Sequence, residues 1–535
     1  MKLFSFHRIF LLICLFFLMI LTPHHSNAQS DIVKQINQII TPEFIRQSID
    51  FLASDSLKGR ETPSPGLDIA ANFIAGKFQT FGLKSIHGSY FQDLSYCNFD
   101  LGSGNFISVG HGLDSEKFFL KTDFVPYDFS GSKQIEGEIV FAGYGITAPE
   151  CHYDDYENVD VKGKIVLVLR QEPGKEDTSH KIFYGDVFAQ HTGIMEKMLQ
   201  AMKHGAIGMI VVSGPLQYSS LKPRGSPWPS LSRTLPWNIL PMGNCKSLTE
   251  NIPVVQVGES VINTLLGSVD SLKNIQIEIE KEMVPHSFLL KGKTMTMNIV
   301  LEAKPIGGKN VIGFLEGSDP ILKNQVVVIG AHYDHVGYLR EHLANTDSIF
   351  NGADDNASGT SGVLAIAKAF AQIPEKPKRS LLFIAFAGEE IGLLGSSTYV
   401  RDPIIPLDQT VAMLNLDMIS RNNPDSLELI GARQNPDLIK IIRMQNKSTN
   451  LILVESKDDH MEGGSDHVNF FNKGIPAIFF FTGLHADYHQ VSDEPAKINA
   501  QKAARVARLA FLTAWYISND NHNYPIINPR EKDEK

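Results

Sequence analysis

The second half of the chain alternates short, almost continuous apolar runs with segments whose apolar residues recur at helical spacing. Such runs predict buried strands, and their alternation with helices predicts an α/β fold: a mostly parallel or mixed sheet with helices on both faces. The expected strands are residues 325–329, 381–386, 411–416, 427–430 and 477–481. The expected helices are residues 362–372, 394–400, 436–445 and 500–515.

The first half of the chain has two different patterns. Near its start, apolar residues such as Phe44, Ile45, Ile49 and Leu52 fall at helical spacing, which predicts helices between residues 40 and 85. From residue 128 to 285, short apolar stretches are separated by Gly, Pro and Asp turns, which predicts a small β-rich unit. Its expected strands are 137–142, 164–169, 207–212 and 252–257, and its one expected helix is 194–204.

The N-terminal segment has the pattern of a secretory signal. Lys2 and Arg8 precede an unbroken apolar run over 9–21, and small residues end the segment at Ser26-Asn27-Ala28. The run is shorter than the roughly 20 residues that span a bilayer, so an uncleaved anchor is the weaker alternative. We expect a signal peptide over 1–28 and an exported protein, periplasmic or extracellular, without a stable membrane span after cleavage.

Charge and cysteine content narrow the class of protein. The 535 residues carry a net charge of −10, and the chain has no basic runs, so nucleic acid and anionic membranes are poor partners. Beyond the signal segment only Cys97, Cys151 and Cys245 remain. They leave room for one disulfide but form neither a disulfide scaffold nor a CxxC zinc site. Stability must therefore come from packing.

Histidine and acidic residues follow the expected strands at the end where each strand stops. They are His332 and Asp334, then Glu389 and Glu390, then Asp417, then His489, with Asp354 and Asp355 in a loop of small residues. Ligand sites in α/β sheets lie beyond the carboxyl ends of the strands. Carboxylates gathered there would repel one another unless a divalent cation bound between them, and mixed His and carboxylate ligands suit zinc.

These segments resemble a known family in their order along the chain. "GAHYDHVG", "NGADDNASG", "FAGEE", "NLDMIS" and "DYHQVSD" are similar to the metal motifs of the M28 co-catalytic zinc peptidases. "GEIVFAGYGI" and "YDDYENVDVKGKIVLVL" resemble the opening of the protease-associated (PA) domain inserted in some members, and "LKGRETPSPGLDIAANFI" resembles the family's entry helix. The resemblance implies a peptidase domain in two parts, 29–127 and 286–522, a PA insertion over 128–285, and a polar tail over 523–535.

The resemblance also implies the metal ligands of two zinc ions. Asp355 is the expected bridging carboxylate, and Asp354 is its non-ligating neighbour. One zinc site is completed by His332 and Asp417, and the other by Glu390 and His489. Asp334 is expected to accept the second ring proton of His332, which fixes the tautomer of that ligand.

Three further residues receive roles from the same motifs. Glu389, next to a ligand, is the expected general base. Tyr488 is either an oxyanion-stabilising phenol or a packing aromatic. His335 is expected either to support a metal ligand without binding the metal or to pack in its loop, and the "SDH" at 465–467 has either a structural role or a substrate contact. The chain has no HExxH and no GxSxG, and its "GYGITA" at 143–148 is followed by Pro149, which argues against a dinucleotide site.

The predicted activity is hydrolysis of peptides, with removal of N-terminal residues as the leading interpretation. A carboxypeptidase or dipeptidase on the same scaffold is the alternative, because only the groups that recognise the peptide terminus differ, and Arg421 would be a candidate cation for a carboxylate. A non-catalytic receptor and a one-zinc, glutaminyl-cyclase-like transferase are weaker alternatives, since all five ligand positions and Glu389 are filled. The sequence leaves the oligomeric state open.

Overall fold

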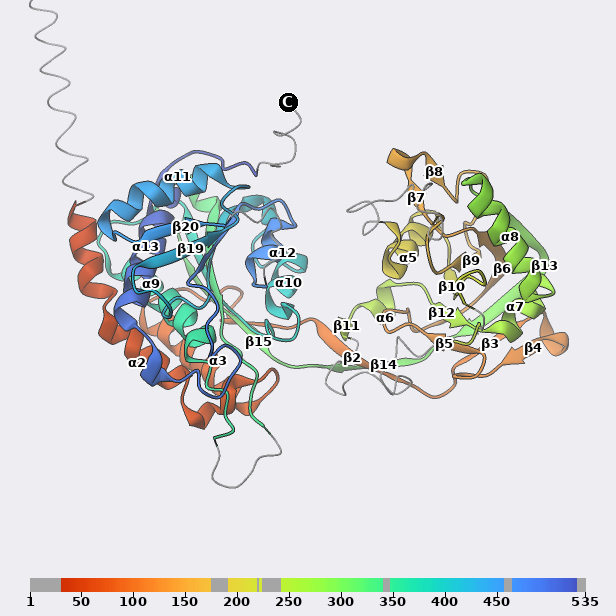
Figure 1. The fold of residues 1–535 in the computed structure, drawn as a ribbon, viewed down its shortest axis with the longest axis horizontal. Helices are drawn as coiled ribbons and strands as arrows, with labels where there is room; N and C mark the ends of the chain where they lie inside the picture. Colours follow the sequence, from red (N-terminus) through yellow and green to blue (C-terminus); the bar gives the residue numbers. More distant parts are fainter. Residues whose placement is uncertain are drawn as a thin grey trace, which may run out of the picture. The chain divides into compact units, whose positions relative to one another are not determined.

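The computed structural model describes residues 30–174, 191–218, 221–223, 242–339, 347–456 and 464–526. The predicted signal peptide and most of the predicted C-terminal tail lie outside these residues. The chain forms two compact units: unit 1 comprises Met1–Leu94 and Gly307–Lys535, and unit 2 comprises Ser95–Ile306. Figure 1 shows both. Among the described residues, no helix has both the length and the apolar character that crossing a membrane requires.

Unit 1 is built on an eight-stranded mixed sheet. Its centre is parallel, with β16 (Val326–His332) between β17 (Ser380–Phe386) and β18 (Thr410–Leu416), and β21 (Ala477–Phe481) beside β18. On one side of this centre, β15 (Lys309–Leu315) is antiparallel to β17, and β1 (Phe91–Asp93) is antiparallel to β15. On the other side, β19 (Ser426–Ile430) is antiparallel to β21, and β20 (Ile452–Glu455) is parallel to β19. All five predicted strands are present, and the α/β fold class is confirmed.

Helices cover both faces of this sheet (Figure 1). One layer contains α2 (Pro42–Leu52), α3 (Pro65–Thr80), α9 (Gly359–Gln372) and α13 (Ala500–Asn519), which contact one another, with α11 (Pro436–Gln445) against α13. The other layer contains α10 (Leu394–Arg401) and α12 (His467–Phe471), which contact each other and the central strands. The sequence fixes the starts of α2 and α3, because Thr41 and Ser64 cap them and a proline follows each cap.

Unit 2 contains a second eight-stranded sheet. Its parallel part consists of β6 (Gln134–Ala142), β9 (Ile165–Leu169), β10 (Gly208–Val212) and β12 (Val254–Val257), as predicted. Antiparallel strands flank it: β13 (Ser287–Asn298), β3 (Phe106–Val109), β4 (Glu116–Phe118) and β5 (Phe124–Pro126). Smaller sheets join β2 (Tyr96–Leu101) with β11 (Met242–Asn244) and β14 (Leu301–Pro305), and β7 (Thr147–Ala148) with β8 (Tyr153–Asp154).

The helices of unit 2 outnumber the single one predicted. In addition to α5 (Ile194–Lys203), the structure contains α6 (Ser247–Glu250), α7 (Glu259–Leu266) and α8 (Val269–Glu282). The helix α8 was not predicted because Ile275, Ile277 and Ile279 alternate with polar residues, and this period is typical of a strand. Only a few residues of the helix are buried, so its helical period is weak in the sequence.

Unit 2 also extends beyond the predicted insert of 128–285 on both sides. Strand β13 pairs with β3 as well as β6, and β14 pairs with β2, so segments before 128 and after 285 complete the same sheets. A disulfide between Cys97 and Cys245 joins β2 to β11, using two of the three cysteines considered above. Sequence patterns did not reveal this boundary because strand pairing, not composition, sets it.

The chain passes between the two units twice, after Leu94 and before Gly307, and a hydrogen bond lies next to these crossings in each unit. The Leu94 amide donates to the Gly308 carbonyl at 3.1 Å in unit 1, and the Ile306 amide donates to the Tyr96 carbonyl at 3.1 Å in unit 2. The chain thus leaves unit 1 and returns to it at neighbouring positions.

We predict that replacing residues 95–306 with a short glycine-rich linker leaves unit 1 folded, because its sheet and helices come entirely from the remaining segments. Deleting only 128–285 should instead give an aggregating protein, since β13 and β3 remain without β6 and expose unpaired strand edges. Size-exclusion chromatography and thermal unfolding followed by circular dichroism test both. A folded 128–285 deletion beside an aggregated linker variant would contradict the boundary.

Candidate metal centre

The carboxyl ends of the central strands of unit 1 bring the predicted side chains together. Strand β16 ends at His332, whose neighbour across the ladder is Phe386, the last residue of β17. Glu389 and Glu390 follow β17 within four residues, and Asp417 directly follows β18 on the other side of β16. The register of these three parallel strands therefore forces the His and carboxylate groups to one edge of the sheet.

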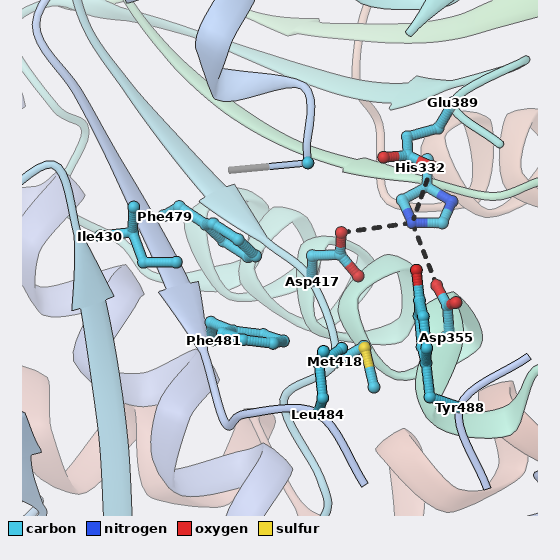
Figure 2. Close-up of a pocket in the computed structure, with 11 residues that line it drawn as sticks. His332, Asp355, Glu389, Asp417, Met418, Ile430, Phe479, Phe481, Leu484 and Tyr488 are labelled. Carbon is cyan, nitrogen blue, oxygen red and sulfur yellow. Dashed lines mark ion pairs between the residues drawn. The ribbon is translucent and has the colours of Figure 1, made fainter. Parts of the chain in front are cut away.

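His332, Asp355 and Asp417 form the first group of potential ligands. His332 Nε2 lies 3.3 Å from Asp355 Oδ1 and 3.3 Å from Asp417 Oδ2. Glu389 Oε2 is 4.0 Å from the same nitrogen. Figure 2 shows these side chains converging on His332 from three elements. All three members of the group are buried.

The second group contains Asp355, Glu390, His489 and His335. His489 Nε2 lies 3.1 Å from Asp355 Oδ2 and 3.0 Å from Glu390 Oε2. His335 Nδ1 lies 2.7 Å from Glu390 Oε1. Asp355 thus has one carboxylate oxygen near each group, which is the arrangement that a bridging ligand requires. The structure brings all five predicted ligands together, while their ligation of metal stays a prediction.

The donor atoms of both groups suit divalent cations. Within each group, one atom from every residue lies within 4.8 Å of all the others. Imidazole nitrogens and carboxylate oxygens at this spacing are the ligands that zinc uses in proteins. Asp417 Oδ1 is buried and has no hydrogen-bond partner among the described residues, which fits a carboxylate oxygen that would contact a bound cation.

The pKa shifts indicate that this cluster lacks positive charge. Burial raises the pKa of the Glu389 carboxyl well above its usual value, and the charges of Asp417, Asp466 and Glu390 act in the same direction. Burial also raises the pKa of Asp417. Burial would lower the pKa of His332, but the neighbouring carboxylates outweigh it and raise the value well above normal. Burial and mutual repulsion thus oppose the charge on the Glu389 and Asp417 carboxyl groups, and a cation bound between them would relieve that repulsion.

Two adjacent glutamates point to different parts of the site. Glu390 contacts His335 and His489 in the second group, while Glu389 lines the cavity beside His332 (Figure 2). The main-chain amide of Glu389 donates to Asp334 Oδ1 at 3.1 Å, which holds the start of this segment. One oxygen of each glutamate also lies within 4.8 Å of the other and of a His332 nitrogen, so the roles of ligand for Glu390 and base for Glu389 stay predictions.

Asp334 has a different contact from the one expected. Its carboxylate oxygen Oδ1 lies 3.7 Å from His332 Nδ1, beyond hydrogen-bonding distance, while the Asp334 main-chain oxygen is nearer at 3.3 Å. The carboxylate accepts hydrogen bonds from the Glu389 amide and from the Thr62 hydroxyl at 3.2 Å. A main-chain carbonyl can fix the tautomer of a ligating histidine, so Asp334 acts through its backbone on His332 and through its side chain on Glu389.

Tyr488 lies at the rim of the cavity. Its ring stacks on the ring of His489 with centroids 3.9 Å apart, and its side chain also lines the cavity near Asp355. Burial and the surrounding carboxylates raise the pKa of its hydroxyl above 10.0, so the group stays a donor at neutral pH. Both roles considered from the sequence are therefore compatible with its position.

His335 lies beside a predicted ligand, which agrees with one of the two roles considered for it. Its fully buried ring contacts Glu390, and it also belongs to the second group of potential ligands. The sequence signal for this position was that His335 stands three residues after the predicted ligand His332. Asp354, the predicted non-ligating neighbour, has other partners: its Oδ1 accepts from the amide and hydroxyl of Ser420, and its Oδ2 lies 3.2 Å from His485.

Two residues support the predicted ligands through hydrogen bonds: Asp493, to which the sequence assigned no role, and Ser465, the first residue of the "SDH" segment. Asp493 accepts from the main-chain amides of Asp354 and Asp355, at 3.0 and 3.1 Å. Ser465 donates to Asp417 Oδ2 at 2.8 Å and accepts from Asn415 at 2.7 Å. The "SDH" segment therefore supports a predicted ligand through its serine.

A cavity of about 250 Å³ opens beside the first group. One wall is polar and consists of His332, Asp355, Glu389 and Asp417 (Figure 2). The remaining wall is mostly apolar: Met418, Ile430, Phe479, Phe481 and Leu484, with Gly464 and Tyr488 at its edge. A ligand in this cavity would touch the candidate metal centre on one side and a hydrophobic surface on the other.

Arg421, the cation considered for carboxylate recognition, does not line this cavity. Its Nη2 lies 2.6 Å from Asp487, and its Nη1 lies 3.8 Å from Asp493. The guanidinium charge is therefore already paired within the chain.

Comparisons with known proteins agree with the resemblance seen in the sequence. The family model described as Peptidase family M28 matches residues 310–514, and the PA domain model matches residues 135–265. The glutamate carboxypeptidase 2 homolog of Caenorhabditis briggsae is 24% identical over 76% of this chain and 58% of its own length. Aminopeptidase YwaD of Bacillus subtilis is 29% identical over 38% of this chain and 43% of its own length.

This chain thus spans about half the length of these curated relatives. Among solved structures, an aminopeptidase from Aneurinibacillus sp. strain AM-1 has 20% sequence identity and a TM-score of 0.46, covering 92% of this chain and 98% of that chain.

We predict that Asp355→Ala loses metal from both groups together, because each of its oxygens faces one group. Elemental analysis of the purified protein measures this, with two equivalents expected in the wild type. Asp155→Ala is a matched control, since Asp155 is an equally buried carboxylate in unit 2 and should leave the metal content unchanged. Two equivalents retained by Asp355→Ala would exclude the bridging role.

Proposed function

Since residues 310–514 belong to peptidase family M28 and residues 135–265 to the PA domain family, we propose that this chain is a di-zinc peptidase that removes N-terminal residues from peptides. The observation that carries this proposal is Asp355, whose two oxygens face two separate sets of His and carboxylate ligands. Glu389, the candidate base, stands beside these ligands and faces the cavity.

Zinc bound at this centre would polarise the scissile carbonyl and lower the pKa of a water from 15.7 towards about 7. The residues of the chain then have separate tasks. Glu389 accepts a proton from the attacking water and delivers it to the leaving amine, because its carboxyl group lines the cavity beside His332. Asp334 keeps the Glu389 backbone in position, and the Tyr488 hydroxyl can donate to the oxygen that becomes negative as the carbonyl is attacked.

Charge at the cavity favours cleavage from the N-terminus over cleavage from the C-terminus. A carboxypeptidase needs an Arg or Lys to meet the terminal carboxylate of its substrate. The residues that line the described cavity include no Arg or Lys, and Arg421 is paired with Asp487. The acidic polar wall favours a substrate ammonium over a carboxylate, although the predicted ligands in it would be present in either kind of enzyme. Carboxypeptidase activity remains the alternative, because a relative carries that name.

The apolar wall supports a preference at the residue that is removed. Met418, Ile430, Phe479 and Phe481 provide a hydrophobic surface within reach of the polar wall. Burying an apolar side chain against such a surface contributes about 1.5–3 kcal/mol relative to leaving it exposed. Large apolar N-terminal residues should therefore be released faster than charged ones.

Two functions of other classes have less support. A receptor that keeps the fold without catalysis has no need for a complete ligand set and a base, yet all are present. A one-zinc transferase has no need for the second group of ligands. We further propose that the protein is exported, in agreement with the signal pattern over 1–28, and that it acts on peptides in the periplasm or outside the cell.

We predict that Glu389→Gln keeps its zinc but loses about 10²–10⁴-fold in kcat, the usual contribution of a general base. Elemental analysis and steady-state kinetics on the same preparation separate the two effects. Glu390→Gln serves as the comparison, because it removes a ligand and should lose metal as well as activity. A near-normal kcat in Glu389→Gln would exclude this residue as the base.

We predict that acetylation of the substrate N-terminus abolishes cleavage, while amidation of its C-terminus does not. The measurement uses matched peptides with Leu, Phe, Asp or Lys at the N-terminus, and product release followed by mass spectrometry. Leu and Phe should give the higher kcat/KM because of the apolar wall. The opposite dependence on the two termini would identify a carboxypeptidase.

A further inference from the structure

Arg60 is a fully buried cation whose side chain contacts the loops that carry the predicted ligands His332 and Asp355. Its guanidinium donates to main-chain carbonyls of three separate segments. Nε donates to Tyr333 at 2.8 Å, Nη1 to Leu52 and to Asn351 at 2.8 Å, and Nη2 to Gly352 at 3.0 Å. Tyr333 follows the predicted ligand His332, and Gly352 precedes the loop of Asp355. One side chain thus connects both ligand-bearing loops to the end of α2.

The main chain around Arg60 strengthens this connection. The His335 amide donates to the Arg60 carbonyl at 3.3 Å, and the Gly337 amide donates to the Gly59 carbonyl at 3.1 Å. Gly59 has a φ of +69°, and a Cβ at this position would lie 2.1 Å from the Gly337 oxygen. Only glycine permits this close approach, so the 59–60 segment lies against the loop after β16.

The buried charge of Arg60 is offset by the carboxylates of the site, none of which accepts a hydrogen bond from its side chain within the described chain. Every hydrogen bond of its side chain within the described chain goes to a carbonyl oxygen. Burial lowers the pKa of Arg60 to about 10, and Asp334, Asp355, Asp493 and Glu390 act in the opposite direction, so the group stays charged at neutral pH. Burying an unpaired charge is unfavourable, which makes a purely space-filling role a poor explanation.

We propose that Arg60 is a positioning residue that holds the loops of His332 and Asp355 in ligating geometry before any metal binds. The inference rests on the proposed metal function, because it assigns these loops to the ligands. In the absence of a cation the carboxylates repel one another, and the fixed guanidinium both offsets this repulsion and ties the two loops together. Arg60 itself contacts neither metal nor substrate.

Arg379 provides a matched control within the same unit. It is also fully buried, and it also donates to carbonyls, of Ile517 at 2.5 Å and His522 at 3.1 Å, as well as to the Gln325 side chain. It precedes β17 at the opposite end of the strand from the ligands. Replacing the planar guanidinium of Arg379 with the ammonium group of lysine should lower the stability of unit 1 without affecting the ligand loops.

The experiment compares the wild type with Arg60→Lys and Arg379→Lys in the full chain. Lysine keeps the charge but cannot bridge three segments with a rigid fork. Each protein is stripped with a chelator and titrated with zinc against a fluorescent competitor, and amide hydrogen exchange is recorded without metal. We expect Arg60→Lys to bind zinc at least ~10-fold more weakly, a typical effect for a group that supports a ligand. Exchange should increase at 333–337 and 351–357 only.

We expect Arg379→Lys to keep wild-type zinc affinity and wild-type exchange in both ligand loops, even where its melting temperature falls. Equal zinc affinity and equal loop exchange in Arg60→Lys and the wild type would overturn the proposal. Uniformly faster exchange throughout unit 1 of Arg60→Lys would also overturn it, because that result indicates a general loss of stability.

If Arg60→Lys does not fold, the metal-free wild type decides the question. The proposal requires the amides of His335 and Gly337 to remain protected without zinc, and rapid exchange there would contradict it. A wild type that binds no zinc would remove the proposed metal function, whereas the exchange data would still report whether Arg60 holds the loops. The two failures are therefore distinguishable.

Discussion

The repulsion among buried carboxylates at one edge of a parallel sheet is the constraint on which the rest of unit 1 depends. Asp355, Glu389, Glu390 and Asp417 converge because β16, β17 and β18 are neighbours in register. Such a cluster is tolerated only when positive charge is supplied, by histidines, by a buried guanidinium or by a bound cation. Among the described residues Asp417 Oδ1 is buried without a hydrogen-bond partner, as expected for an oxygen that would contact such a cation.

The surrounding structure holds these groups in position mostly through main-chain atoms. Asp493 accepts from the amides of the Asp355 loop, and Arg60 donates to two carbonyls that precede that loop and to the Tyr333 carbonyl beyond β16. Asp334 fixes the amide of Glu389. Contacts of this kind orient ligands without competing for the metal, because none of them uses a ligating atom. The residues that hold the ligand loops therefore contribute to the geometry of the site as much as the predicted ligands do.

Unit 2 supplies no member of either ligand group within the described residues. Its sheet is closed by pairing between segments that lie before and after the predicted insert, and a disulfide joins two of them. Its independence from the metal centre agrees with the separate match of residues 135–265 to the PA domain family.

The sequence by itself predicted the central strands of unit 1 and the helices between them, because apolar periodicity is a local property. It placed His and carboxylate residues after these strands, and the resemblance of the motifs to the M28 family selected the five predicted ligands among them. Only the tertiary structure decided the extent of unit 2, the inclusion of His335, the contacts of Asp334 and the position of Arg60. These depend on pairing between distant segments and on bonds to main-chain carbonyls. Since every residue has a carbonyl, no sequence pattern can indicate which ones a buried guanidinium will bind.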